Sequence, residues 1–180
     1  RASIRQDRED LQGAEEDIQK SIDWEEQQAQ RDERALSILY ASRASIRQDR
    51  EDLQGAEEDI ARSINWGEQQ SPRDERSLAV WYASRARIRR DREDLQGAEE
   101  DIQKSIDWEE QQAQPNQREL AIRYASRASI RQDREDLQGA EEDIQKSIDW
   151  EEQQAQRDER ALSILYASRA SIRQDREDLQ

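Results

Sequence analysis

The sequence predicts an all-α solenoid, an array of antiparallel helical hairpins in which each hairpin packs on its neighbours. Three observations lead to this fold class. The string Arg-Ala-Ser-Ile-Arg-Gln-Asp-Arg that opens the chain returns, unchanged or with substitutions, every 42 residues, at Arg43, Arg85, Arg127 and Arg169. The composition favours helix, with only 2 Pro and 5 Gly in 180 residues. The apolar residues recur at spacings of three and four, which is the periodicity of a helix with one buried face.

The repeat sets the domain organisation. It divides the chain into four full units and one partial unit, which are residues 1–42, 43–84, 85–126, 127–168 and 169–180. Because solenoid units contact only their neighbours, we expect one repeat array over residues 1–180 without a central core. The chain starts and stops within a unit, so we expect a fragment of a larger protein that exposes a stacking face at each end.

The first helix of a unit is expected to run from about Asp32 to about Arg50. The Asp32 carboxylate can accept a hydrogen bond from an unpaired backbone N–H of the first turn. Pro72 and Pro115 fall just before the same point in the second and third units, where a loop or a first helical turn tolerates proline. The prolines therefore support a helix start near residue 32.

The second helix of the unit is expected to begin after Asp52 as its N-cap and to end near Gln70. Its apolar stripe is Leu53, Ala56, Ile60, Ile64 and Gly67. These spacings of three and four predict an amphipathic helix. The carboxylates of residues 57–59 suit the positive end of the helix dipole and predict a solvated acidic face.

Three arginines share one face of the first helix, namely Arg43, Arg47 and Arg50. They could hold an anion or pair with carboxylates of the second helix. The abundance of acidic residues in the second helix favours the ion pairs.

Every full unit carries one tryptophan late in its second helix and one tyrosine in its first helix. We expect these aromatic residues to be structural and to lie between neighbouring hairpins, and a ligand platform is the alternative for the tryptophans. The residues are Trp24, Trp66, Trp108 and Trp150, with Tyr40, Tyr82, Tyr124 and Tyr166.

The composition excludes several kinds of site. The chain has no Cys and no His, which excludes disulfides, thiol nucleophiles, zinc–thiolate sites and a histidine base. A net charge of -15 opposes binding to nucleic acid and to anionic membranes. No apolar run approaches the roughly 20 residues of a membrane-spanning helix. We therefore expect a cytoplasmic protein without cofactor, metal or enzymatic activity.

Residues 52–64 resemble the second helix of the tetratricopeptide repeat. In that family a small residue is followed by a large apolar residue and then by another small one, and here these are Ala56, Ile60 and Ser63. In the first helix, Ala44 can take the place of the family's small residue. The places of a leucine, a tyrosine and the turn glycine of the family are taken here by Arg43, Arg47 and Glu51.

The length of the unit is similar to the 42-residue class of tetratricopeptide-like repeats, seen in kinesin light chains and in the recognition arrays of STAND/NLR-type signalling ATPases. This resemblance implies a right-handed superhelix whose first helices line the concave side. It also implies a protein or peptide ligand. The Lys and Asn pattern of the family's carboxylate clamp is not matched.

Differences between the copies suggest where a partner could bind. Leu, Trp, Arg and Leu occupy one position of successive units, and because a buried site rarely accepts all three residue types, we expect this position to be exposed. The expected surface combines it with two positions that gain arginine, and comprises Leu39, Ser45, Gln48, Trp81, Arg87, Arg90, Arg123 and Leu165. The alternative is neutral drift, with the added arginines paired to nearby carboxylates.

Two functions remain open from the sequence. The first is a non-enzymatic module or scaffold that binds a protein or peptide. The second is a purely structural repeat array, or a model sequence for repeat folding, that associates end to end with other copies.

Overall fold

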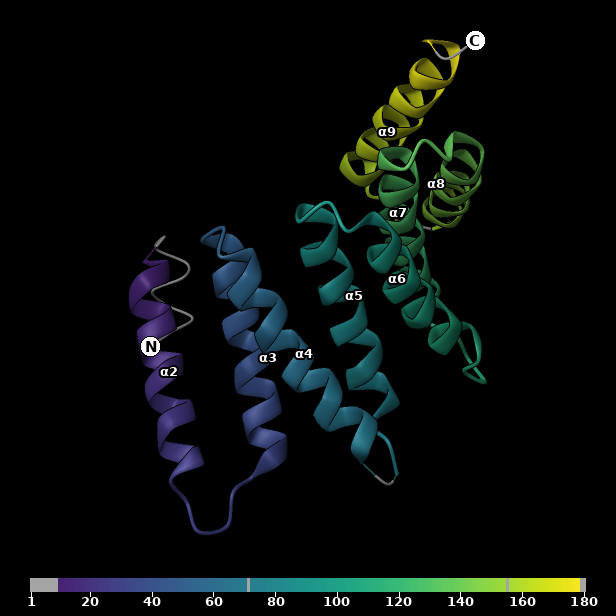
Figure 1. Ribbon diagram of the computed structural model, residues 1–180. Coiled ribbons are helices and arrows are strands. Elements are labelled where there is room, and N and C mark those ends of the chain that lie inside the picture. The colour runs from purple at the N-terminus through teal and green to yellow at the C-terminus, as the bar shows by residue number, and fades with distance from the viewer. Residues whose placement is uncertain (1–9, 71, 155, 179–180) are drawn as a thin grey trace. The chain divides into compact units, whose positions relative to one another are not determined.

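The computed structural model describes residues 10–70, 72–154 and 156–178, and within them the chain is helical with no strand. The predicted all-α solenoid of helical hairpins is confirmed (Figure 1). The helices are α2 (Leu11–Glu26), α3 (Glu33–Asp49), α4 (Leu53–Gln69), α5 (Glu75–Asp91), α6 (Leu95–Glu110), α7 (Gln117–Asp133), α8 (Leu137–Glu152) and α9 (Glu159–Asp178).

Capping residues start the helices where the sequence predicts. The first helices of the units, here called A helices, are α3, α5, α7 and α9, and the second or B helices are α2, α4, α6 and α8. The Asp32 side chain accepts a hydrogen bond from the Ala35 N–H at 2.9 Å, and Asp52 accepts one from the Gly55 N–H at 3.0 Å. In α7 the cap is Asn116, which accepts from the Glu119 N–H at 3.3 Å.

The turn from an A helix to its B helix has a left-handed residue where the tetratricopeptide pattern has glycine. That residue is Glu51, with φ of 64°, and its counterpart Glu135 has φ of 63°. The Asp52 N–H donates to the Arg47 carbonyl and the Glu51 N–H to the Gln48 carbonyl, each at 2.9 Å. This pair of bonds is a Schellman motif, which satisfies carbonyls at the end of the A helix.

The chain divides into two compact parts, residues 1–92 and 93–180. In the first part α4 packs against both α3 and α5, and in the second part α8 packs against both α7 and α9. Each of these B helices therefore has an A helix on two sides. The core of the first part comprises Ala44, Ala56, Ile60, Ile64, Leu78, Trp81, Tyr82 and Ile88. The core of the second part comprises Ala128, Leu137, Ala140, Ile144 and Ile172.

Two predictions concern membranes and the ends of the array. No helix in the described part of the chain is long and apolar enough to cross a membrane. Residues 1–9, in which the sequence predicts the end of an A helix, lie outside the described residues, so the predicted stacking face at the start of the chain is not described.

Candidate interaction surface

A buried network of arginine and aspartate holds each hairpin closed. Asp59 of α4 is only 1% exposed, and its two carboxylate oxygens accept from Arg43 Nε and Nη2 at 2.6 Å each. Arg47 Nη1 donates to the same carboxylate at 3.0 Å. The predicted ion pairs between the two helices are confirmed. The prediction of a solvated acidic face is wrong for Asp59, because two guanidinium groups compensate its burial.

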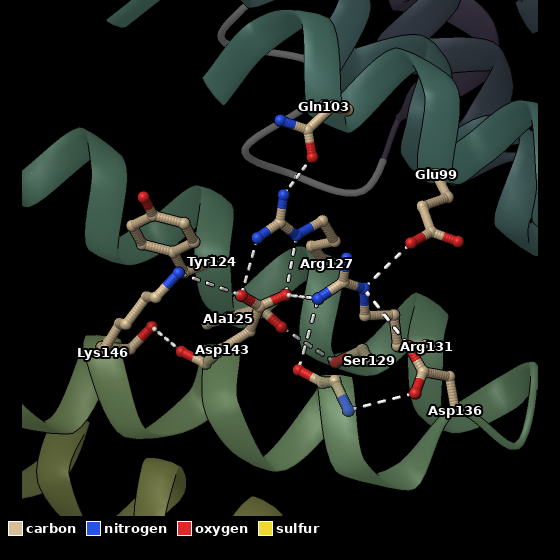
Figure 2. A network of polar contacts seen from close by, with 12 residues as sticks. Glu99, Gln103, Tyr124, Ala125, Arg127, Ser129, Arg131, Asp136, Asp143 and Lys146 are labelled. Carbon is tan, nitrogen blue, oxygen red and sulfur yellow. Dashed lines mark hydrogen bonds and ion pairs between the residues drawn. The ribbon is translucent and has the colours of Figure 1, made fainter. Parts of the chain in front are cut away.

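The network also reaches the preceding B helix, as Figure 2 shows for the second part. Arg127 binds both oxygens of Asp143 at 2.7 Å and also donates to the Gln103 side chain. Arg131 donates to Glu99 at 2.9 Å and to Asp143 at 2.9 Å. Burial alone would lower the pKa of Arg127, but the hydrogen bond and charge of Asp143 outweigh it and raise the pKa. These arginines connect α6, α7 and α8 and do not form an anion site.

Trp81, predicted to be exposed, is only 6% exposed, so that prediction is wrong. Its ring meets the Trp66 ring edge-on, with centroids 6.2 Å apart. The Trp81 ring occupies space that a side chain at Gly67 of α4 would fill. A Cβ atom at Gly67 would lie 2.9 Å from the Trp81 ring and 2.8 Å from a Leu78 methyl group. Trp81 therefore belongs to the core between α4 and α5.

Arg123, the counterpart of Trp81, is 5% exposed, so the prediction that it is exposed is also wrong. Its Nε donates to the Ser105 hydroxyl at 2.6 Å, and its Nη1 lies 3.7 Å from Glu109 and 3.2 Å from Glu119. The position accepts Trp or Arg because the facing residue of the B helix differs between units. Gly67 faces the tryptophan, whereas Glu109 faces the arginine.

The other residues of the predicted surface have different environments. Leu39 and Leu165 are half-buried. Ser45 and Arg87 are exposed, and Gln48 and Arg90 are half-buried.

Gln48 makes a contact between two A helices. Its Nε2 donates to Asp91 of α5 at 2.6 Å. In the second part, Gln132 of α7 similarly donates to Asp175 of α9 at 2.5 Å. Within each part, a glutamine at this position therefore joins two A helices.

The tyrosines lie between a B helix and the next A helix. Each tyrosine hydroxyl donates to a glutamate near the end of the preceding B helix, in the pairs Tyr40–Glu26, Tyr82–Glu68, Tyr124–Glu110 and Tyr166–Glu152. Burial, followed by the hydrogen bond to Glu110, raises the pKa of Tyr124 to about 12. These contacts fall between hairpins, at the place where the sequence predicts the tyrosines.

The tryptophans of the B helices differ in burial. Trp66, Trp108 and Trp150 are half-buried, but Trp24 is 63% exposed, so the prediction that Trp24 lies between hairpins is wrong.

The surroundings of Trp150 show how a half-buried tryptophan of a B helix lies against its A helix. Trp150 lines a pocket of about 260 Å³ together with Gln117, Leu120 and Tyr124 of α7.

An exposed aliphatic side chain recurs once on every A helix. Apart from Trp24 and Tyr166, the exposed large hydrophobic residues of the described chain all occupy one position of the unit. We call them the aliphatic row, which comprises Ile38, Val80, Ile122 and Ile164, each between 51% and 59% exposed. The surface predicted from the sequence does not include this position. The missed signal is that every copy is β-branched and aliphatic.

Polar side chains surround the aliphatic row on the same face of each helix. At 100° per residue, Arg34, Ser42, Ser45 and Asp49 all lie within about 40° of Ile38. We call this set of positions the A face. On α5 it comprises Arg76, Val80, Ser84, Arg87 and Asp91, on α7 Arg118, Ile122, Ser126, Ser129 and Asp133, and on α9 Arg160, Ile164, Ser168, Ser171 and Asp175. An arginine therefore lies at the N-terminal edge of the face and an aspartate at the C-terminal edge.

Comparison with known proteins identifies the fold. No protein-family model matches the chain, and no curated protein matches it. A similar solved structure is BtubC (BKLC) from P. vanneervenii, with a TM-score of 0.83 at 15% sequence identity over 98% of this chain and 70% of that one. A candidate kinesin light chain from Podosopora anserina with nearly identical TPR-like repeats has a TM-score of 0.81 at 14% identity, over 98% of this chain and 84% of that one.

The fold is that of a tetratricopeptide-like repeat protein. A second structure of the Podosopora anserina protein, a variant with one substitution, agrees, with a TM-score of 0.82 at 13% identity over 98% of this chain and 84% of that one. Within this tetratricopeptide-like fold, the departures of the chain from the family pattern have structural explanations. Arg43 and Arg47 replace apolar packing by the buried network around Asp59. Glu51 occupies the left-handed conformation of the turn glycine.

Proposed function

We propose that this chain is a non-enzymatic, cytoplasmic binding module whose A face holds a segment of another protein. The aliphatic row is the observation that carries the proposal. The tetratricopeptide-like fold supports it, because such repeats generally interact with proteins. The net charge of -15 argues against nucleic acid as the partner.

The aliphatic row has no evident benefit for the fold. Ile and Val are weaker helix formers than Ala, because a β-branched side chain loses rotamer freedom against the preceding helical turn. Ile38 leaves 53% of its surface in solvent, so it gains only part of the free energy of burial. Positions that break a local preference without compensation are typical of functional sites. A partner that covers the row would supply the missing burial.

Peptide selection tests this proposal. Short random peptides would be selected against the intact chain and then measured against a variant with Ile38→Ala and Val80→Ala. We expect a loss of affinity of about tenfold or more, since the variant removes the apolar centre of the A face. The matched control is Trp24→Ala, which removes an exposed apolar side chain from a B helix. Selected peptides that bind the A-face variant as well as the original chain would refute the proposal.

The A-face variant should keep its fold. Exposed substitutions of this kind change the free energy of unfolding by less than about 0.5 kcal/mol. Urea unfolding of the variant and of the Trp24→Ala control checks this point, so that lost binding is not confused with lost structure.

A second candidate function, end-to-end association, is favoured by the surface of α9. Residues 159–178 repeat the sequence of residues 33–52. Ser37 and Ala44 of α3 are buried beneath α4, whereas their counterparts Ser163 and Ala170 of α9 are exposed.

We propose a second copy of the chain as the occupant of this face of α9. Its helix α2 has the same sequence as α8, and α8 already packs against the A helix α7 within this chain. An intramolecular interface thus provides the template for an intermolecular one.

Sedimentation velocity over a concentration series tests the association. The mean mass of the original chain should rise with concentration, and Ala170→Glu should suppress the rise by placing a charge in the contact. The control is Ile164→Glu on the same helix, at an exposed position whose counterpart Ile38 stays 53% exposed although α4 packs on α3. A monomer at every concentration would exclude end-to-end association.

A further inference from the structure

We infer that the segment bound by the A face is an extended acidic peptide with an aliphatic side chain at about every third residue. This inference rests on the proposed binding function and names the chemistry of the partner. It is carried by the arginines of the A face, by their exposure and by the spacing of the A helices.

An exposed arginine accompanies every member of the aliphatic row, one helical turn toward the N-terminus. In the first part these are Arg34 beside Ile38 and Arg76 beside Val80. Helix α5 adds a second arginine on the same face, Arg87, which lies two helical turns toward the C-terminus from Val80 and one turn before Asp91. The A face thus has a basic edge in a protein whose net charge is -15.

The arginines of the A face differ from those of the buried network. The Arg34 side chain is 70% exposed, and its ion pair with Asp74 is long, at 3.7 Å. Asp74 already caps α5, where it accepts from the Ser77 N–H at 3.1 Å and the Ser77 hydroxyl at 2.9 Å. Arg43, by contrast, has 6% of its side chain exposed and binds Asp59 at 2.6 Å. The Arg34 guanidinium therefore retains capacity to bind a carboxylate of a partner.

The acidic groups of the A face lie at its opposite edge. Asp91 is fifteen residues after Arg76 on α5, and it accepts a hydrogen bond from Gln48 at 2.6 Å. Glu33 and Glu75 neighbour the arginines in sequence but lie about 140° around the helix from Ile38 and Val80. Arg34 and Arg76 therefore form a basic N-terminal edge, and the carboxylates of a bound peptide would point to it.

The repeat of the helices sets the repeat of the partner. Packed helices lie about 8–10 Å apart, and a chain in the extended polyproline II conformation rises about 3.1 Å per residue with three residues per turn. A peptide that crosses α3 and then α5 would therefore present an equivalent side chain about every third residue. One aliphatic residue and at least one carboxylate in each such step would match Ile38 with Arg34 and Val80 with Arg76.

Three fluorescent peptides test this inference. They share leucine at every third position and carry glutamate, glutamine or lysine at the others, and their affinities are measured by fluorescence anisotropy at low and at physiological salt. We expect the glutamate peptide to bind at least about tenfold more tightly than the glutamine peptide, with an affinity that falls as salt rises.

Matched charge variants locate the interaction. Arg34→Gln with Arg76→Gln should weaken binding of the glutamate peptide about tenfold and reduce its salt dependence. The control is Lys20→Gln with Arg62→Gln, which removes the same charge from exposed positions of the B helices α2 and α4 and should change the affinity less than about twofold.

The outcomes separate the inference from the proposed function. Equal binding of the glutamate and glutamine peptides, equal effects of the two charge variants, or binding of none of the peptides would each overturn the acidic partner. If the glutamine peptide binds and loses affinity with Ile38→Ala and Val80→Ala, the acidic partner is rejected while the binding function stands.

Discussion

At the scale of single residues, the buried aspartate of the B helix determines how a hairpin closes. Asp143 is 1% exposed and is bound by Arg127 and Arg131 of the A helix, which also hold Gln103 and Glu99 of the preceding B helix. A buried charge of this kind is tolerated only with its partners in place. The same arrangement recurs around Asp59, so the repeat reproduces the same set of arginine partners for a buried aspartate.

Loss of the carboxylate charge should therefore be costly. Asp143→Asn leaves the buried guanidinium group of Arg127 without its counter-ion, and we expect the free energy of unfolding to fall by about 3 kcal/mol. The measurement is urea unfolding. The control is Asp149→Asn on the exposed side of the same helix, which should cost less than about 0.5 kcal/mol. Equal effects of the two substitutions would show that the network contributes no specific stability.

Replacement of the left-handed glutamate of the turn should instead raise the free energy of unfolding. A residue with a Cβ atom in this conformation costs about 1–2 kcal/mol, which glycine avoids. Since Glu51 is exposed and has φ of 64°, Glu51→Gly should raise the free energy of unfolding by about 1 kcal/mol.

A second glycine substitution provides the control for Glu51→Gly. Glu58→Gly, at an exposed position within α4, should lower the free energy of unfolding by about 1 kcal/mol. If both glycine substitutions destabilise the chain, the left-handed strain at Glu51 is not significant.

At the scale of the helices, neighbouring hairpins are matched by pairs of residues that differ together. Gly67 accommodates Trp81, and Glu109 pairs with Arg123. In the first unit the corresponding pair is Glu25 and Leu39, and Glu25 there accepts a hydrogen bond from the Asp32 N–H at 2.8 Å. Different pairs of residues can therefore form the contact between a B helix and the next A helix.

A double-mutant cycle tests this coupling. Gly67→Glu alone would overpack the contact with Trp81, and Trp81→Leu alone would leave a cavity, so each should destabilise the chain by about 1–3 kcal/mol. The double variant recreates the Glu25–Leu39 pair and should recover at least about 1 kcal/mol of the summed loss. Additive effects in urea unfolding would mean that the two positions are independent.

The same pairs explain how much could be predicted from the sequence. Helix starts at Asp32 and Asp52 were predictable because an N-cap depends on local residues, and the ion pairs of Arg43 and Arg47 were predictable from the abundance of facing carboxylates. The burial of Trp81 was not predictable from its own position. It depends on a glycine in another helix, and a comparison of copies one position at a time does not reveal that dependence.

The binding surface was only partly predictable for a related reason. Ser45 and Arg87 were identified and lie on the exposed A face, but they were found among the positions that change most between copies. Ile38 and Val80 change little, and their exposure follows from which side of the helix faces α4.

At the scale of the whole molecule, the fold divides its arginines between two tasks. Those around Asp59 and Asp143 are buried or half-buried and join helices, whereas those beside the aliphatic row are exposed. Repetition presents the same combination of arginine and branched aliphatic side chain on successive A helices. A repeating partner could use several such sites at once, and its affinity would then exceed that of any single contact.

The central claim is that the aliphatic row is where the partner binds, and methyl NMR tests it most directly. The isoleucine δ1 methyl groups would be labelled, and a peptide selected against the intact chain would be titrated in. We predict that the signals of Ile38, Ile122 and Ile164 shift first and most, while those of the buried Ile60 and Ile102 change little. Shifts that spare the three exposed isoleucines and follow the Trp24 side chain of α2 instead would contradict the account.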